Sequence, residues 1–320
     1  MTKLSGAAHR LMSQQHGAVS ARQLLDTGLT TRQLQHLAES GQLVHLVRGA
    51  YASPSRTIDE LTRCAALCLA RRDVVIAGPT AGRLWAFRHV SRDRRVHVIA
   101  PPRAQPCRDQ RVAVYRSAAI HPEDVVVRPD GIRVTSRPRT ALDLSRHVAP
   151  HELLSIIEQA MRDGYHSDAD MRRTAVDWIS PQRPWLIDYL RQLDRRVPGK
   201  PAESRPEVDL GQALLEAGVQ PLERQFSLDL PGYGPARFDL AVPDINWAIE
   251  VDVHPTHEDV SGAGSDRQRD VGAVALGWLV TRVSRDRYNG WFDEVVADLV
   301  SIFRARTTAV RGANRRPSGN

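Results

Sequence analysis

Apolar residues near the start of the chain recur at helical spacing in three short stretches. Ser20 is suited to cap the second stretch and Thr30 or Thr31 the third, and Gly28 follows the second as a stop. Two apolar strands with a turn between them come next. The predicted helices are Ala7–Gln15, Ala21–Thr27 and Thr31–Ser40, and the predicted strands are Leu43–Val47 and Ala50–Ala52. This order predicts a winged helix-turn-helix over residues 1–55.

Short apolar runs alternate with amphipathic stretches over residues 56–165, which predicts a mixed α/β domain. The predicted helices are Thr57–Arg72, Thr80–Phe87, Arg139–Val148 and His151–Arg162, and the predicted strands are Val74–Ala77, Arg95–Ala100 and Arg111–Arg116. Residues 166–203 are polar and interrupted by prolines. We therefore expect a linker there, with local helix around Trp185–Leu193.

From Ser204 the pattern predicts a third domain over 204–306 that combines strands with helices. Its predicted strands are Phe226–Leu230, Ala236–Val242, Trp247–Val253 and Trp278–Val283, and its predicted helices are Pro206–Glu216, Asp266–Leu276 and Gly290–Arg304. Residues 307–320 are expected to form a disordered basic tail. The whole chain is therefore predicted to be of the α/β (α+β) class.

The most informative chemistry lies around a tight loop after Val242. If this loop closes a hairpin, Val242 faces Trp247, and counting back along both strands places Asp239 opposite Glu250. Asp252 then lies on the same sheet face. The intervening apolar residues point into a core: Phe238, Leu240, Ile249 and Val251. Three carboxylates on one face repel one another unless a cation such as Mg2+ or Mn2+ joins them, and a slip of one residue would separate the first two.

Residues around this hairpin extend the candidate site. His257 is a candidate base or metal neighbour, or a histidine of a solvated loop. Arg267 and Arg269 could steady a phosphate or pair with the aspartates beside them. Glu207 could reach the metal or its water, although acidic residues are favoured in the first turn of any helix.

The polar face of the third predicted helix lies off the stripe of Leu34 and Leu37. Arginine can form two hydrogen bonds with guanine, and glutamine can do so with adenine. Arg48 at the wing tip could reach the DNA backbone or the minor groove. The predicted DNA contacts are Thr31, Arg32, Gln33, Gln35, His36 and Arg48. A helix that binds protein or bridges domains would carry a similar polar face.

Composition changes this picture little. The chain has 320 residues and a formal net charge of +7, which favours polyanionic partners, but Lys3 and Lys200 are its only lysines, so an arginine bias accounts for part of the charge. No apolar run is long enough for a membrane span or a signal core, so a cytoplasmic protein without a membrane partner is expected. Three cysteines (Cys64, Cys68 and Cys107) are too few for a disulfide framework or a zinc site, and the first two have the spacing of core residues on a helix.

Several short motifs follow one another between residues 203 and 300. They are Phe238-Asp239, Ile249-Glu250-Val251-Asp252, His257, Asp266-Arg267-Gln268-Arg269-Asp270 and Gly277-Trp278-Leu279-Val280-Thr281-Arg282. Together they resemble the very-short-patch-repair-like branch of the PD-(D/E)XK nucleases. The resemblance implies a magnesium-dependent nuclease fold, a mixed sheet flanked by helices. It also implies that Asp239, Glu250 and Asp252 are active-site acids, that His257 stands at the family's histidine and that Glu207 stands at its first-helix glutamate. Asp252 replaces the usual lysine and Val253 follows it instead of glycine, which leaves open a domain that binds DNA without cutting it.

A second set of motifs lies within residues 5–165. These are Gly28-Leu-Thr-Thr-Arg-Gln-Leu34, Leu43-Val-His-Leu-Val-Arg-Gly-Ala-Tyr51, Thr80-Ala-Gly-Arg-Leu-Trp85 and Gly131-Ile-Arg-Val-Thr-Ser-Arg-Pro-Arg-Thr-Ala-Leu-Asp-Leu144. They resemble the AbiEi-type antitoxins. That resemblance implies a winged-helix DNA binder that represses its own operon, with a cognate toxin or a second copy of the chain as a further partner.

Two main hypotheses follow. In the first, the chain is a metal-dependent DNA endonuclease positioned by its winged helix. In the second, it is a non-catalytic regulator or antitoxin that uses the nuclease-like fold as a scaffold. A weaker third hypothesis is a repair factor that cuts only mismatched or structured DNA.

Overall fold

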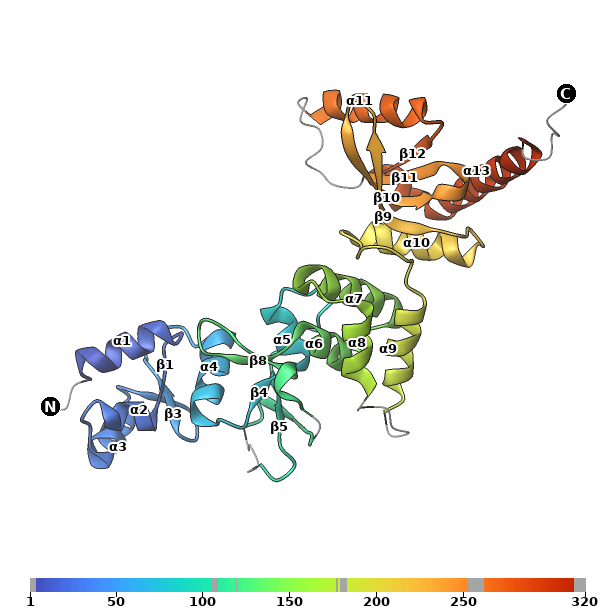
Figure 1. Cartoon of the computed structure of the whole chain (residues 1–320). Helices are drawn as coiled ribbons and strands as arrows, with labels where there is room; N and C mark the ends of the chain where they lie inside the picture. The colour runs from blue at the N-terminus through green and yellow to red at the C-terminus, as the bar shows by residue number, and fades with distance from the viewer. Residues whose placement is uncertain are drawn as a thin grey trace, which may run out of the picture. The chain divides into compact units, whose positions relative to one another are not determined.

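The computed structural model describes residues 4–104, 109–118, 120–176, 178, 183–252 and 262–313, with the side chains of 262–268 and 313 left aside. The chain divides into two compact units, each of which combines helices with strands (Figure 1). The N-terminal unit comprises residues 1–153 and 167–189, and the C-terminal unit comprises residues 154–166 and 190–320. The α/β class predicted from the sequence is confirmed.

The N-terminal unit begins with the helices and wing of a winged helix-turn-helix. Its elements are α1 (Gly6–Gln14), β1 (Ala18–Ser20), α2 (Ala21–Asp26), α3 (Thr31–Glu39), β2 (Val44–Val47) and β3 (Ala50–Ala52), with the strands in the order β1-β3-β2. Ser20 and Thr30 cap α2 and α3, each in a reciprocal pair with the glutamine three residues later. Leu34 and Leu37 are buried, so α3 presents its polar face outward.

A five-stranded mixed sheet in the order β6-β5-β4-β8-β7 forms the rest of this unit. The elements are α4 (Glu60–Ala70), β4 (Val75–Ile76), α5 (Gly78–Leu84), β5 (Val96–Ala100), β6 (Val112–Arg116), η1 (Pro122–Asp124), β7 (Val125–Val127), β8 (Arg133–Thr135), α6 (Arg137–Leu144) and α8 (Asp168–Val176). Cys64 and Cys68 are buried in the core between α4 and the sheet, as their spacing predicted. The sequence pattern missed β7 and β8, which are only three residues long.

Two boundaries between the units along the sequence fall within helices, after Leu153 and after Tyr189. These helices are α7 (Pro150–Gly164) and α9 (Trp185–Asp194). The C-terminal unit continues with α10 (Arg205–Glu216), β9 (Glu223–Leu230), β10 (Gly234–Val242), η2 (Pro243–Ile245), β11 (Trp247–Asp252), α11 (Gly262–Ala275), β12 (Leu279–Ser284), α12 (Arg285–Gly290) and α13 (Phe292–Ala313). Its sheet has the order β12-β11-β10-β9, with β12 parallel to β11 and the other pairs antiparallel.

The hairpin of β10 and β11 has the predicted register, because Val242 pairs with Trp247. One expectation about its faces was wrong. Phe238 packs with Trp278 near α11, whereas Leu240 belongs to the core that includes residues of α10 and α13. The faces change where the ladder between β10 and β9 lacks the pair of Asp239 with Gln225, and the backbone of Gln225 is left-handed there, with φ 49°.

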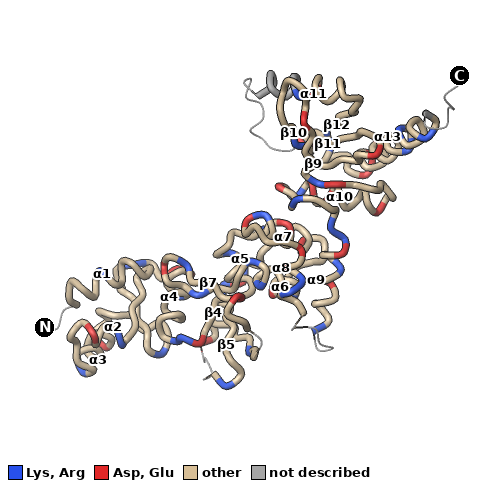
Figure 2. The backbone as a smooth tube through the Cα atoms, in the orientation of Figure 1, with Lys and Arg blue, Asp and Glu red and all other residues tan. Residues whose placement is uncertain are grey.

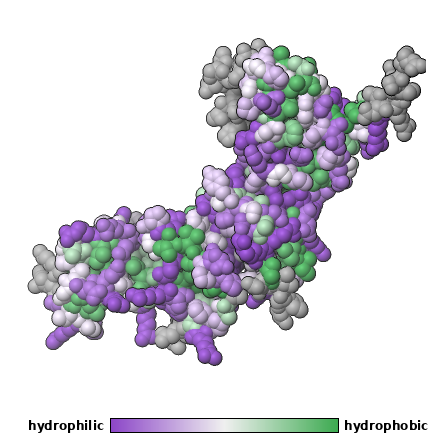
Figure 3. All heavy atoms as spheres, viewed as in Figure 1, coloured by the Kyte–Doolittle hydropathy of each residue, from purple (hydrophilic) through white to green (hydrophobic). Residues whose placement is uncertain are grey.

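Two segments expected to lack structure are folded instead. Residues 197–203 were expected to belong to a linker, but Val197 and Ala202 are fully buried, and the carbonyl of Pro198 accepts a 2.8 Å hydrogen bond from the backbone of Arg224. Residues 307–313 were expected to belong to a disordered tail, but α13 extends to Ala313 and Val310 packs against the core. The rest of the expected tail lies outside the described residues. Figure 3 shows the mostly hydrophilic surface of the described residues, with apolar patches between.

Candidate functional site

The outer face of α3 is the first candidate site. Thr31, Arg32, Gln35 and His36 are all exposed on this helix, and Arg48 is exposed at the turn between β2 and β3. Among the described residues, neither arginine pairs with a carboxylate. Two cations thus stay available to a polyanion on the elements that a winged helix offers to DNA.

The two glutamines of this face differ in how they are used. The side-chain oxygen of Gln33 accepts the backbone N–H of Thr30 at 2.9 Å, so this side chain completes the capping box of α3. Gln35 donates to Glu39 at 2.8 Å on the exposed surface. Gln33 is therefore fixed by the helix cap, whereas the hydrogen bond of Gln35 is exposed and water can replace it.

A hollow of about 1320 Å³ opens beside the wing and was not predicted from the sequence. Its charged lining residues are Arg48, Arg71, Arg72, Arg103, Asp73 and Asp109. Arg71 pairs with Asp73 at 3.2 Å, and the balance of the lining remains basic. The basic positions are drawn in blue in Figure 2. The Arg71-Arg72 doublet at the end of α4 was the available signal, but only the fold brings it close to the wing.

The carboxylates of the C-terminal unit form the second candidate site. Pairing of β10 with β11 ends at Leu240 and Ile249, one residue before Asp239 and Glu250. Beyond that point, the Asp239 side chain accepts the backbone N–H of Val251 at 2.8 Å. The predicted hairpin therefore brings the two acids to the same end of the ladder.

Glu207 of α10 and Gln225 of β9 complete the surroundings of Asp239. The amide nitrogen of Gln225 donates to Glu207 at 2.8 Å and to Asp239 at 3.3 Å, so one side chain links the two acids. Burial raises the pKa of Asp239 to about 6, and the charges of Glu207 and Glu250 add to this effect. Hydrogen bonds from Val251 and Gln225 oppose it. Gln225 was not predicted as a site residue, because it lies one residue before the predicted strand Phe226–Leu230 and a single glutamine carries no distinctive signal.

Two arginines hold Glu250. Arg269 of α11 lies 2.5 Å from one carboxylate oxygen, and Arg282 of β12 lies 2.9 Å from the other. Arg282 is the register partner of Glu250 on the parallel strand and also bonds Asp270 at 2.9 Å. Arg269 was predicted either to steady a phosphate or to pair with the aspartates beside it, and in this structure it forms an ion pair with the candidate acid Glu250.

The remaining predicted site residues either lie at the exposed end of β11 or fall outside the described residues. Asp252 is exposed at the end of β11, opposite Ser284. Arg237, which lies opposite Asp252 in the predicted register, pairs with Glu203 at 2.6 Å. His257 and the side chain of Arg267 lie outside the described residues.

The carboxylates as placed do not fit a Mg2+ site. Mg2+ prefers hard oxygen ligands, and Glu207, Asp239 and Glu250 supply such oxygens. However, Glu250 faces two guanidinium groups, and Asp239 and Glu207 each accept internal N–H groups. In the part of the chain that the structure describes, no three His, Cys, Asp or Glu side chains form a group that could hold a metal ion. We therefore derive no metal-assisted step from this geometry.

Comparisons with known proteins give little further guidance. No protein-family profile and no curated protein matches the chain. One solved structure that it matches is the crystal structure of the RV2827C protein from Mycobacterium tuberculosis, with 16% sequence identity and a TM-score of 0.38 over 61% of this chain and 78% of that one. This likeness is too weak to support an argument. Within the described residues, no helix has the length and apolar character needed to cross a membrane.

Proposed function

We propose that the chain binds double-stranded DNA through its winged helix, with α3 in the major groove and the wing on the neighbouring backbone. The observation that carries this proposal is the exposed pair Arg32 and Arg48, which lie on the recognition helix and the wing tip and pair with no carboxylate among the described residues. Gln35 and His36 lie beside Arg32 on the same exposed face.

Arg32 and Arg48 are expected to contact different parts of the DNA. The major groove is wide enough for a helix, and an arginine fork matches the two acceptors of guanine. A wing arginine that contacts phosphate adds affinity that depends on salt more than on sequence. Arg32 is therefore expected to specify bases, and Arg48 to position the protein.

The test is selection from a random-sequence DNA duplex library by the full chain, followed by affinity measurements on the enriched duplex. Arg32→Ala should weaken binding by roughly tenfold or more and relax the preference at one or two base pairs. Arg10→Ala, which removes an exposed arginine of α1, is the matched control. It should change the affinity for DNA less than threefold, because an exposed charge outside the contact contributes little. Failure to enrich any duplex, or equal losses in both variants, would contradict the proposal.

A second candidate function is metal-dependent hydrolysis of DNA by the C-terminal unit. It is favoured by the nearness of Glu207 and Glu250 to Asp239, although these carboxylates as placed do not fit a Mg2+ site. Burial raises the pKa of Asp239 to about 6, and the charges of the two glutamates add to this effect. The arginines on Glu250 favour the alternative, a fold that binds or regulates without cutting.

Supercoiled, nicked and mismatched DNA incubated with Mg2+ or Mn2+ separates these two readings. Cutting by the wild-type chain that disappears in Asp239→Ala supports hydrolysis. Binding to the enriched duplex without cutting any of these substrates supports a non-catalytic regulator.

A further inference from the structure

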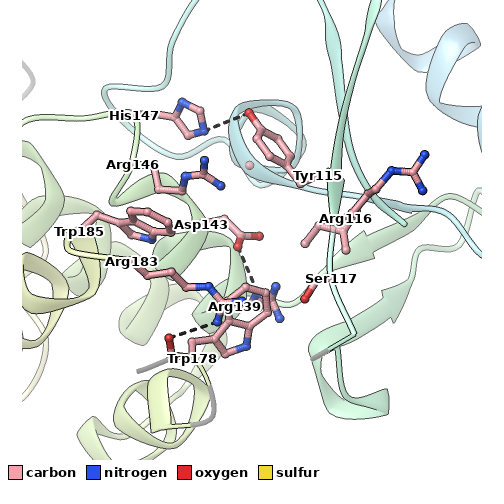
Figure 4. Close-up of a pocket in the computed structure, with 12 residues that line it drawn as sticks. Tyr115, Arg116, Ser117, Arg139, Asp143, Arg146, His147, Trp178, Arg183 and Trp185 are labelled. Carbon is pink, nitrogen blue, oxygen red and sulfur yellow. Dashed lines mark hydrogen bonds and ion pairs between the residues drawn. The ribbon is translucent and has the colours of Figure 1, made fainter. Parts of the chain in front are cut away.

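A separate pocket in the N-terminal unit has the size and lining of a small ligand site (Figure 4). Its volume is about 90 Å³. One water needs roughly 10–15 Å³ on this measure, so the space holds several waters or one phosphate-sized group. The pocket lies where β5 and β6 end, beside the last turn of α6 and the residues Trp178, Arg183 and Trp185.

Two arginines of this pocket form cation–π contacts with aromatic rings. The guanidinium of Arg146 lies 4.5 Å from the ring centre of Trp185 and 5.0 Å from that of Tyr115. The guanidinium of Arg183 lies 4.3 Å from the ring centre of Trp178, whose carbonyl it also bonds at 3.2 Å. Neither arginine pairs with a carboxylate in the described residues. Ring stacking fixes these cations without neutralising their charge.

The acidic residue that lines the pocket, Asp143, already forms an ion pair within the protein. Asp143 pairs with the fully buried Arg139 at 3.1 Å, and Arg139 also pairs with Asp124 at 3.0 Å. This ion-pair group accounts for the negative charge of the lining. Among the described residues, no carboxylate forms an ion pair with Arg146 or Arg183, although the charge of Asp143 acts on Arg146 at longer range.

A buried donor points to the kind of ligand. The indole N–H of Trp178 is buried and has no hydrogen-bond acceptor among the described residues. Such a donor is costly to leave without a partner. An oxyanion in the pocket would supply the acceptor and would also face both arginines.

One wall of the pocket is held in place by a chain of side-chain hydrogen bonds. Asp93 bonds His97 at 3.1 Å, and the other ring nitrogen of His97 bonds the Tyr115 hydroxyl at 2.9 Å. The same hydroxyl lies 3.4 Å from a ring nitrogen of His147. Burial, with smaller contributions from His97 and Arg146, lowers the pKa of His147 to about 4, so its ring is neutral at neutral pH. A neutral ring fixed in this way adds a polar wall without adding charge.

We propose that this pocket binds the phosphate group of a nucleotide, with Arg146 and Arg183 as its cationic ligands and the Trp178 indole as a further donor. Guanidinium groups match phosphate oxygens in geometry and charge, and the surrounding rings offer faces on which a base can stack. The phosphate can come from a free mononucleotide or from a DNA strand. This site is independent of the DNA contact proposed for α3.

Calorimetry on the full chain tests the pocket with three probes: inorganic phosphate, deoxyadenosine monophosphate and a 5′-phosphorylated single-stranded oligonucleotide. Arg183→Gln and Arg146→Gln should each weaken binding of the probes by about tenfold or more. Arg116→Gln is the matched control. Its guanidinium bonds the carbonyls of Pro102 and Ala104 and points away from the other two arginines in Figure 4, so affinity should stay nearly unchanged.

The wild-type chain gives a second readout that does not depend on any variant folding. A bound phosphate beside the neutral ring of His147 should raise the pKa of that ring, which NMR titration with and without phosphate measures. Binding of the mononucleotide assigns the site to free nucleotides, and binding of the oligonucleotide alone assigns it to a strand. The proposal is overturned if no probe binds, if the pocket variants bind as the wild type does, or if oligonucleotide binding is lost only in Arg32→Ala.

Discussion

Asp239 joins β10 to β11 through its side chain, because its carboxylate accepts the backbone N–H of Val251 at 2.8 Å beyond the last paired residues of the two strands. The same carboxylate lies in the field of two other acids. It therefore combines a structural hydrogen bond with an unfavourable electrostatic position, and the two effects can be separated by pH.

The first prediction concerns stability against pH. The pKa of Asp239 rises from 3.8 to about 6 on folding, so its stabilising contribution is complete below about pH 4 and is lost as the pH rises through 6. Asp239→Asn keeps an acceptor for Val251 but has no charge. We expect this variant to match the wild type near pH 4 and to exceed its free energy of unfolding by up to about 3 kcal/mol above pH 7.

Urea unfolding at the two pH values measures this difference. Asp244→Asn, at an exposed aspartate of the same hairpin, is the control and should change stability equally at both. A gain for Asp239→Asn that does not depend on pH would show that the charge of Asp239 is not the cause.

The second prediction concerns a buried ion group in the C-terminal unit. Glu158 is almost fully buried, pairs with Arg224 and with Arg196 (2.8 Å), and accepts the backbone N–H of Ala202 at 3.1 Å. Glu158→Gln leaves two guanidinium groups without their counter-charge. We expect the free energy of unfolding to fall by about 3–5 kcal/mol.

A surface pair serves as the comparison for this variant. Glu216 pairs with Arg195, and both side chains are about half exposed, so Glu216→Gln should lower stability by less than about 1 kcal/mol. Similar losses for Glu158→Gln and Glu216→Gln in chemical unfolding would contradict the assigned importance of the buried group.

The third prediction concerns Gly199. Its φ is +109°, and an added Cβ would overlap the backbone oxygen of Arg224. Gly218 also has a positive φ, of +86°, but its Cβ would meet open space. Because only the first change adds a clash with backbone, we expect Gly218→Ala to lower stability by about 1–2 kcal/mol and Gly199→Ala by clearly more. Equal melting temperatures for the two variants would argue against the close packing of residues 197–203 on β9.

The fourth prediction concerns salt. If Arg48 contacts phosphate, Arg48→Ala should weaken binding of unrelated duplexes to a similar extent and lower the slope of log affinity against log salt by about 1. Titrations on the selected and on an unrelated duplex at several salt concentrations measure both effects. A loss confined to the selected duplex would instead assign Arg48 to base recognition.

Local rules predicted the parts of the fold that depend on neighbouring residues. The capping residues before α2 and α3 and the register of Val242 with Trp247 follow from short-range sequence patterns. Phe238 was assigned to the wrong core because strict alternation was assumed, whereas the faces of β10 change at Asp239, which is unpaired opposite the left-handed backbone of Gln225. No residue pattern around Gln225 announces that conformation.

The candidate acids were predictable, but their partners were not. Asp239 and Glu250 are brought to one end of the ladder by the length of a single loop, which the sequence displays. The guanidinium groups of Arg269 and Arg282 reach Glu250 from α11 and β12, and such pairings depend on how distant elements pack. The pocket of Arg146 and Arg183 depends on tertiary packing in the same way and gave no signal in the sequence.

If α3 binds DNA as proposed, the capping role of Gln33 limits how many base pairs one copy of the chain can recognise. With that side chain tied to Thr30, the exposed polar residues left on α3 for base contacts run mainly from Arg32 to Gln35 and His36. The helix rises about 6 Å over the four steps from residue 32 to residue 36, which spans about two base-pair steps. So short a recognition sequence recurs throughout any genome. A single operator would be recognised only if a second DNA-binding domain on the same duplex lengthened that sequence.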